Sequence, residues 1–101
     1  MKEEAALIRD ALLTPGEYSS VEEINKGGCA KFANRLIEAT GKGELMWSSN
    51  FHKYFDLKHK RDRYHGHVVV FYKGKLYDAE NTDGVVHPDD LNFFKHRFMN
   101  G

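Results

Sequence analysis

A β-hairpin in the second half of the chain is the feature that most limits how this sequence can fold. Residues 67–72, His-Val-Val-Val-Phe-Tyr, are mostly β-branched and aromatic, which favours a strand. Residues 75–79, Lys-Leu-Tyr-Asp-Ala, form the expected partner strand, and Lys73-Gly74 between them fits a two-residue turn. The sequence therefore predicts a pair of antiparallel strands connected by a tight turn.

The length of that turn fixes which side chains share a face of the hairpin. If Lys73-Gly74 is the whole turn, Tyr72 faces Lys75 and the pairs run back until position 67 faces position 80. His67, Asp78 and Glu80 then lie on one face, with Asp78 diagonal to His67. A turn longer or shorter by one residue would move Asp78 to the opposite face, so the register is a testable expectation.

Helical segments are predicted in the first half of the chain. Apolar residues at helical spacing favour a helix over residues 3–13, which Thr14-Pro15-Gly16 would end. Ser20-Val21-Glu22-Glu23 has the form of a capping box, so a short helical turn is expected there, broken at Gly27-Gly28. A stronger helix is predicted over residues 29–39. Its apolar face carries Cys29, Ala33, Leu36, Ile37 and Thr40, with Phe32 at the margin.

Residues 42–66 give weaker signals. The spacing of residues 51, 54 and 55 fits a short helix, and the charged residues 58–63 fit a solvated loop. A last helix is predicted from Pro88 toward Phe98, with carboxylates at its start and basic residues at its end. This order of elements predicts an α+β fold, in which a small antiparallel sheet packs on helices.

Length and charge narrow the function classes. The 101 residues have room for a single domain, residues 1–101. Fifteen basic residues balance fifteen acidic ones, which argues against a nucleic-acid binder because such proteins carry a basic excess. No apolar run is long enough to span a bilayer, and the acidic N-terminus does not resemble a signal peptide. We therefore expect a cytoplasmic protein with no membrane partner.

The single cysteine, Cys29, is the strongest candidate for a chemical function. One cysteine excludes an internal disulfide and a zinc site built from several thiolates. Cys29 follows two glycines at the start of the best predicted helix, where free backbone N–H groups and the helix dipole favour the thiolate. Its own N–H is placed to serve as an oxyanion donor. The alternative is an inert core thiol, because cysteine is often buried and Cys29 lies on the apolar face.

A thiolate nucleophile works with a histidine, which in turn needs an orienting partner. His67 begins the strong strand, and Asp78 lies on the same face of the returning strand. These residues predict a triad of Cys29, His67 and Asp78. The spacing leaves Glu80 and Asp83 as alternative partners for His67.

The sequence also resembles papain-like cysteine hydrolases, and most closely small bacterial and phage proteins of that superfamily. The resemblance covers about residues 27–94. The matching motifs are Gly28-Cys29-x-x-Phe32-Ala33-x-x-Leu36, His67-Val68-Val69-Val70, Gly74, Tyr77-Asp78-Ala79-Glu80, Gly84-Val85 and Asp90-Leu91-Asn92-Phe93-Phe94. The resemblance implies a papain-like core, with Cys29 as nucleophile, His67 as general base and acid, and Asp78 as its orienter.

Two departures from the family pattern bear on the substrate. Papain-like proteases carry a glutamine before the cysteine as an oxyanion donor, whereas here only Asn25 stands in that stretch as an amide. The 101 residues are also far fewer than in such a protease, so we expect no second lobe to bind a long peptide. Asn25, Gly28 and Trp47 are the expected oxyanion and substrate-binding residues, and Tyr54 and Phe55 are further candidates for an acyl pocket.

The expected reaction is hydrolysis or acyl transfer at an amide, peptide or isopeptide bond, with a peptide, protein or small amide as substrate. It requires no cofactor. The alternative function is a non-catalytic module that binds another protein through the same fold.

Two other sequence patterns suggest functions different from a cysteine hydrolase. A metal site can be drawn from His65-Gly66-His67 with His52, His59 and Asp62, but this histidine spacing on a loop is a weak signal. Basic and aromatic residues alternate over 53–64, as in a single-strand nucleic-acid binder. The acidic residues within that stretch favour a solvated loop instead.

Overall fold

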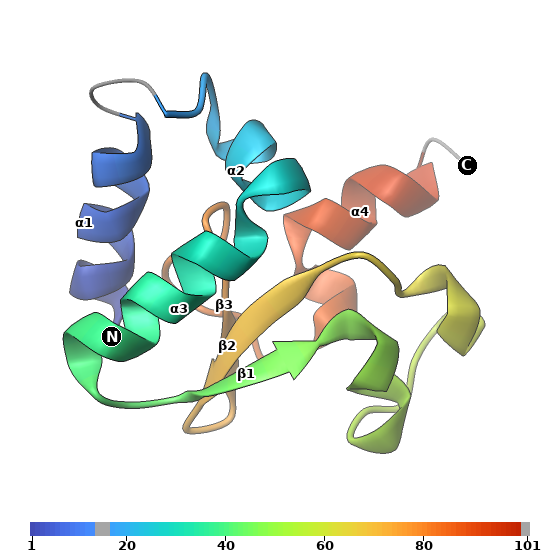
Figure 1. The fold of residues 1–101 in the computed structure, drawn as a ribbon. Helices are drawn as coiled ribbons and strands as arrows, with labels where there is room; N and C mark the ends of the chain where they lie inside the picture. The colour runs from blue at the N-terminus through green and yellow to red at the C-terminus, as the bar shows by residue number, and fades with distance from the viewer. Residues whose placement is uncertain (14–16, 100–101) are drawn as a thin grey trace.

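Helices pack on both sides of a three-stranded sheet in the computed structural model, which describes residues 1–13 and 17–99 (Figure 1). The helices in this part of the chain are α1 (Lys2–Leu13), α2 (Val21–Gly27), α3 (Cys29–Thr40) and α4 (Asn92–Met99). The strands are β1 (Glu44–Trp47), β2 (Val68–Tyr72) and β3 (Lys75–Tyr77), and short 3₁₀ turns cover Ser48–Lys53, Arg61–Arg63 and Pro88–Asp90. The predicted α+β class, with a small antiparallel sheet packed on helices, is confirmed.

The hairpin between β2 and β3 has the predicted register. Tyr72 pairs with Lys75, and Val70 pairs with Tyr77. Lys73 and Gly74 both have positive φ, 48° and 79°. Positive φ at both central residues is what a two-residue turn needs if it is to match the twist of its strands.

Strand β3 ends at Tyr77, two residues earlier than the sequence suggested. The reason is the side chain of Asp78, whose Oδ1 accepts the backbone N–H of Glu80 at 3.1 Å and of Asn81 at 2.8 Å. An aspartate that binds the backbone two and three residues ahead turns the chain. The strand pairing therefore stops where the candidate site begins.

Strand β1 lies in the segment for which the sequence predicted no strand. It is antiparallel to β2, with Trp47 opposite Val68 and Glu44 opposite Phe71, and it forms an edge of the sheet. Only Met46 among its residues is partly buried. An edge strand of four residues with little buried surface has no clear alternation of apolar and polar side chains, which is why the pattern missed it.

The first helices follow the predicted pattern closely. Helix α1 matches the expected range, while the predicted stop at residues 14–16 lies outside the described residues. The Ser20 side chain caps α2 by accepting the N–H of Glu23 at 3.2 Å. Helix α3 ends at Gly41, whose φ is +65°. Phe32 is fully packed in the core rather than at the margin of the apolar face.

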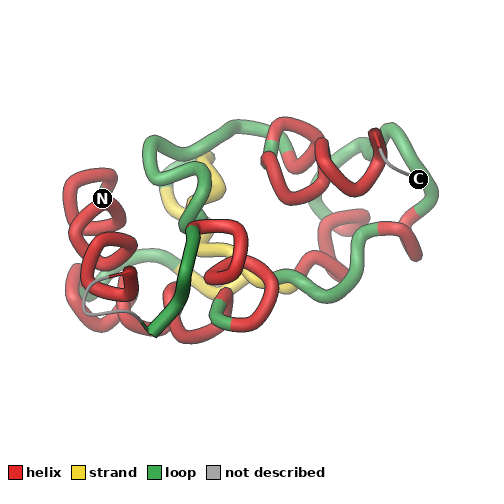
Figure 2. The backbone as a smooth tube through the Cα atoms, turned by 90° about the horizontal axis from the view of Figure 1, so that it is seen from above, coloured by secondary structure: helices red, strands yellow, loops and turns green. Residues whose placement is uncertain are grey.

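The two faces of the sheet cover different cores. Val68, Val70 and Tyr77 pack against α1 and α3, as Figure 1 shows for the helices. Val69 and Leu76 point the other way, into a largely aromatic cluster built from the 3₁₀ turns and α4. That cluster contains Phe51, Tyr64, Leu91 and Phe94. Figure 2 shows α4 at the opposite end of the molecule from α1.

The expected single helix from Pro88 to Phe98 is broken in two. Leu91 has ψ 129°, which ends the 3₁₀ turn of Pro88–Asp90. The backbone N–H of Asn92 then donates to Asn81 Oδ1 at 3.0 Å, at the start of α4. This break directs the first turn of α4, and Phe93 in it, toward the end of the sheet where His67 lies. No helix in the described ranges is long and apolar enough to cross a membrane.

Candidate active site

His67 and Asp78 form a buried pair beside the end of the β2–β3 hairpin. His67 Nε2 lies 2.8 Å from Asp78 Oδ2, and the two side chains are 0% and 1% exposed. This is the diagonal contact that the predicted register requires. The two alternatives lie elsewhere: Glu80 binds Asn25, and Asp83 is exposed.

The carboxylate of Asp78 is held from both sides. Its Oδ1 accepts the two backbone N–H groups of the turn, and its Oδ2 accepts from the imidazole of His67. An ionised carboxylate only accepts hydrogen bonds, so Nε2 of His67 carries the proton in this contact. Nδ1, the second ring nitrogen, is therefore the one left to act on another group.

Aromatic rings hold the imidazole of His67 in place. The Phe93 ring stacks on it with centroids 4.1 Å apart and planes 8° apart, and Phe94 contacts it edge-on at 6.0 Å. The backbone is fixed as well, because His67 N–H donates to Ser48 Oγ at 3.1 Å and Ser48 N–H donates to His67 O at 2.8 Å. The ring is thus restrained in both position and tilt.

Cys29 lies at the first turn of α3, half-buried, next to the start of β2. Burial raises the pKa of its thiol, but hydrogen bonding with His67 and with the backbone N–H groups of Val68 and Ala30 lowers it by more. The pKa of Cys29 is therefore below its ordinary value. The β2–β3 ladder ends at Val70, which leaves the N–H of Val68 outside that ladder and available to the sulfur.

The pKa of His67 is shifted in the complementary direction. Burial lowers it, but hydrogen bonds with Asp78 and then with Cys29 raise it by more, so the net pKa is raised. His67 Nδ1 is buried and has no partner of good hydrogen-bond geometry among the described residues. Thiol and imidazole thus influence each other through a looser contact than the one between His67 and Asp78. Both shifts favour a thiolate–imidazolium pair.

Gly28 lies between α2 and α3, directly before Cys29, and the ring of Tyr18 packs against it. A Cβ at Gly28 would lie 2.6 Å from both Cζ and Oη of the Tyr18 ring. The N–H of Gly28 donates to Ile24 O at 2.7 Å. The side of Gly28 on which a Cβ would lie is thus occupied by Tyr18, and the expected part of Gly28 in oxyanion or substrate binding stays a prediction.

Gly28→Ala is therefore expected to destabilise the protein by about 1–3 kcal/mol, because the added methyl overpacks the contact with Tyr18. Tyr18→Ala in the same chain should recover part of this loss, so the two costs in urea unfolding should be less than additive. Gly27→Ala is the matched control, since a Cβ there meets nothing within 4 Å. If the losses of stability in the two single variants add up in the double variant, contact with Tyr18 is not the reason that position 28 requires glycine.

Asn25, expected as an oxyanion donor, lies on α2 and is 1% exposed. Its Nδ2 donates to Glu80 Oε1 at 2.9 Å, and its buried Oδ1 has no partner in the described part of the chain. The amide of Asn25 thus connects the helix before Cys29 to the turn that carries Asp78. One of the two amide hydrogens of Asn25 is therefore already donated to Glu80 and is not free to bind an oxyanion.

The aromatic candidates for an acyl pocket are in three different environments. Trp47 is 50% exposed and lies opposite Val68 in the sheet, close to the strand residue that contacts the thiol. Tyr54 is 66% exposed. Phe55 packs edge-on against Phe51 at 6.2 Å and belongs to the aromatic cluster.

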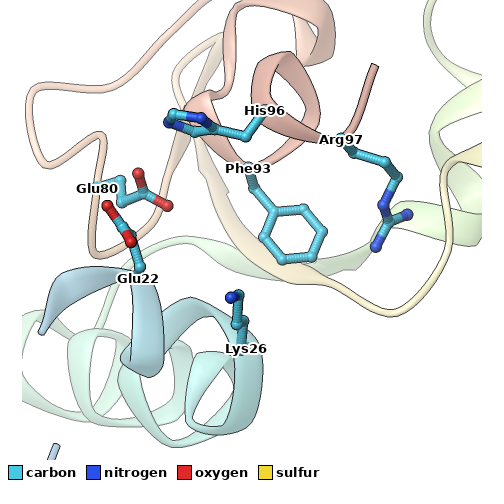
Figure 3. A pocket seen from close by; sticks show the side chains of 6 residues that line it. All are labelled: Glu22, Lys26, Glu80, Phe93, His96 and Arg97. Atoms are coloured by element: carbon cyan, nitrogen blue, oxygen red, sulfur yellow. The ribbon is translucent and has the colours of Figure 1, made fainter. Parts of the chain in front are cut away.

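A groove of about 460 Å³ opens beside this site, between α2 and α4 (Figure 3). The described residues that line it are Glu22, Lys26, Glu80, Phe93, His96 and Arg97. Trp47 is not among them. Phe93 is shared between the groove and the candidate site, because the same ring stacks on His67. Phe93 belongs to one of the motifs that carry the resemblance, but its contact with His67 could not be predicted locally, because it depends on where α4 begins.

Several residues of the two competing patterns take part in packing. Tyr64 is fully buried, and burial together with a hydrogen bond to Asp89 raises its pKa to about 12. The His59 ring lies tilted against the Phe98 ring, with centroids 3.9 Å apart, and His65 Nδ1 lies 3.2 Å from Arg97 Nη1. No group of three or more histidine, cysteine, aspartate or glutamate side chains that could hold a metal occurs within the described residues.

Comparisons of the chain with protein-family models, with curated proteins and with solved structures gave no match.

Proposed function

We propose that this protein is a cysteine-dependent hydrolase or acyltransferase that acts on an amide, peptide or isopeptide bond. The observation that supports it best is the buried His67, which binds Asp78 through Nε2 and leaves Nδ1 for the thiol of Cys29. A papain-like core and a cytoplasmic location, where a single thiol stays reduced, belong to the same proposal.

In the proposed reaction, the Cys29 thiolate attacks the carbonyl carbon of the amide and forms a C–S bond. The His67 imidazolium gives its proton to the leaving nitrogen as the C–N bond breaks, which leaves a thioester on Cys29. Water, or an acceptor amine, then attacks the thioester carbonyl while His67 takes up the proton, and the C–S bond breaks to release the Cys29 sulfur. The products are a carboxylic acid or a new amide, and the free thiol is restored.

Asp78 keeps the proton of His67 on Nε2 and stabilises the charged imidazolium. The oxyanion formed in the attack would be met by the N–H of Cys29 itself, in the first turn of α3, where backbone N–H groups have no partner within the helix. No metal or cofactor takes part in these steps.

The test is the rate at which iodoacetamide labels the folded protein between pH 5 and 9. Because the pKa of Cys29 is lowered, the rate should rise with pH through a midpoint below the ordinary thiol value of about 8.5. In His67→Ala, burial still raises the pKa of Cys29, but the hydrogen bond with His67, the largest effect that lowers this pKa, is lost. The midpoint should then move up, and labelling at pH 6 should fall by about tenfold or more.

Labelling that appears only in denaturant would contradict the proposal, and Cys29 would then be a core thiol. The function to test next would be protein binding. The specific observation in its favour is that Leu45 and Trp47, both on the edge strand β1, are 42% and 50% exposed. An exposed edge strand with apolar side chains is a known surface for adding a partner's strand.

A further inference from the structure

The groove between α2 and α4 has charges of opposite sign at different places along it. Figure 3 shows the carboxylates of Glu22 and Glu80 together at one end, away from Arg97, with the Phe93 ring between them and Arg97. Lys26 lies on the α2 side, below that ring. The volume of about 460 Å³ is within the range of small-molecule sites, about 300–1,000 Å³.

None of these four charged groups forms an ion pair within residues 1–13 and 17–99. The ion pairs among the described residues involve neither the two glutamates nor the two cations that line the groove. Glu80 accepts a hydrogen bond from the neutral amide of Asn25. Arg97 Nη1 donates to backbone carbonyls, Arg63 O at 3.1 Å and His65 O at 2.8 Å. Two positive and two negative charges therefore remain for a ligand.

A buried acceptor lies next to the acidic end. Asn25 Oδ1 has no hydrogen-bond partner in the described part of the chain, although the residue is only 1% exposed. Its amide lies directly beside Glu80, since Nδ2 and Oε1 are 2.9 Å apart. Asn25 does not itself line the groove, so its amide acts on this end through Glu80, whose carboxylate it holds in position.

We infer that the groove binds a small zwitterion of the size of an amino acid or dipeptide. Its ammonium group lies at Glu22 and Glu80, and its carboxylate lies at Lys26 and Arg97. Its apolar part contacts the portion of the Phe93 ring that lines the groove, beside the Arg97 guanidinium, which lies over that ring 4.8 Å from its centroid. Phe93 contacts the imidazole of His67, so the ligand is separated from the proposed catalytic residue by one ring. That this ligand is part of the substrate rests on the proposed function, whereas the binding site itself does not.

The test uses three related probes on the full-length chain carrying Cys29→Ser, which prevents turnover. Glycyl-phenylalanine has both charges, its N-acetyl form lacks the ammonium, and its amide form lacks the carboxylate. Binding is followed by backbone amide shifts in ¹H–¹⁵N spectra. The free dipeptide should shift the amides of residues around Lys26 and Phe93, and each blocked form should bind about fivefold more weakly.

Single variants show which end of the ligand each charge meets. Glu22→Gln should weaken the free dipeptide and its amide form but leave the N-acetyl form unchanged. Lys26→Met should weaken the free dipeptide and the N-acetyl form but leave the amide form unchanged. Glu23→Gln and Lys95→Met, which change the neighbouring surface without touching the groove, should have no effect on any probe.

Equal affinity for all three probes, or no shifts around the groove, would overturn the inference. Preference for the N-acetyl form over the free dipeptide would overturn it in favour of a simple anion site. Failure here is distinguishable from failure of the proposed function, because iodoacetamide labelling of the wild-type protein does not depend on the groove. Rapid labelling without dipeptide binding would refute only this site, and the reverse result would refute only the enzyme.

Discussion

Asp78→Ala is expected to lower the free energy of unfolding by about 3–5 kcal/mol, because it breaks a fully buried pair and leaves His67 without its partner. The substitution also removes the acceptor of the two backbone N–H groups that end β3. For a domain whose total stability is about 5–15 kcal/mol, this is a large fraction. Urea unfolding followed by circular dichroism measures it.

Two further variants separate the charge of Asp78 from its hydrogen bonds. Asp78→Asn keeps an oxygen for the backbone N–H groups but loses the charge that faces His67, so we expect a smaller loss than with alanine. Asp83→Asn changes an exposed carboxylate in the same loop and should cost little. A loss of similar size at Asp78 and Asp83 would mean that the buried pair is unimportant for stability.

The difference between wild type and Asp78→Asn should also depend on pH. The folded-state pKa of His67 is raised above its unfolded value, so its contribution is fully present below about pH 6.5 and is lost as the pH rises through the raised value. The wild-type advantage over Asp78→Asn should therefore be larger at pH 6 than at pH 9. An advantage that is the same at both pH values would contradict the assigned pair.

Phe94→Ala is the second substitution with a large expected effect, again about 3–5 kcal/mol. Phe94 is 0% exposed, and its ring contacts Phe51, Tyr64 and Phe93 with centroids 5.9, 5.2 and 5.0 Å apart. Alanine leaves a cavity at the centre of the aromatic cluster. Phe98→Ala, at the partly exposed edge of the same cluster, should cost less in urea unfolding.

The same residue connects stability to the candidate site. Phe94 packs on both Phe93 and His67, so a milder variant, Phe94→Leu, should loosen the imidazole without unfolding the protein. We expect the pH midpoint of iodoacetamide labelling of Cys29 to rise in this variant. An unchanged midpoint would show that the aromatic cluster does not position His67.

The contact between His67 and Asp78 could be predicted because it depends on local rules. A two-residue turn with positive φ fixes the hairpin register, and the register fixes which side chains share a face. Cys29 at a helix start could also be predicted, because Gly28 and the apolar spacing that follows it mark the boundary. These signals need only a few neighbouring residues.

Other parts of the structure had no such signal. Strand β1 has one partly buried residue and is defined by its pairing with β2. The clash that excludes a side chain at Gly28 comes from Tyr18, and the stack on His67 comes from Phe93, 26 positions further along the chain. Each depends on how separate elements meet.

The sequence by itself determined the fold class, the hairpin register and the residues able to form a cysteine–histidine–aspartate set, because helix ends, turns and strand alternation are local. The tertiary structure decided that Glu80 is bound to Asn25 instead of competing for His67, that both aromatic neighbours of His67 come from α4, and where the charged groove lies. Those contacts depend on the break at Leu91 and on packing between α2, α4 and the sheet. Long-range packing selects among arrangements that local propensity allows, and only the folded chain shows which one results.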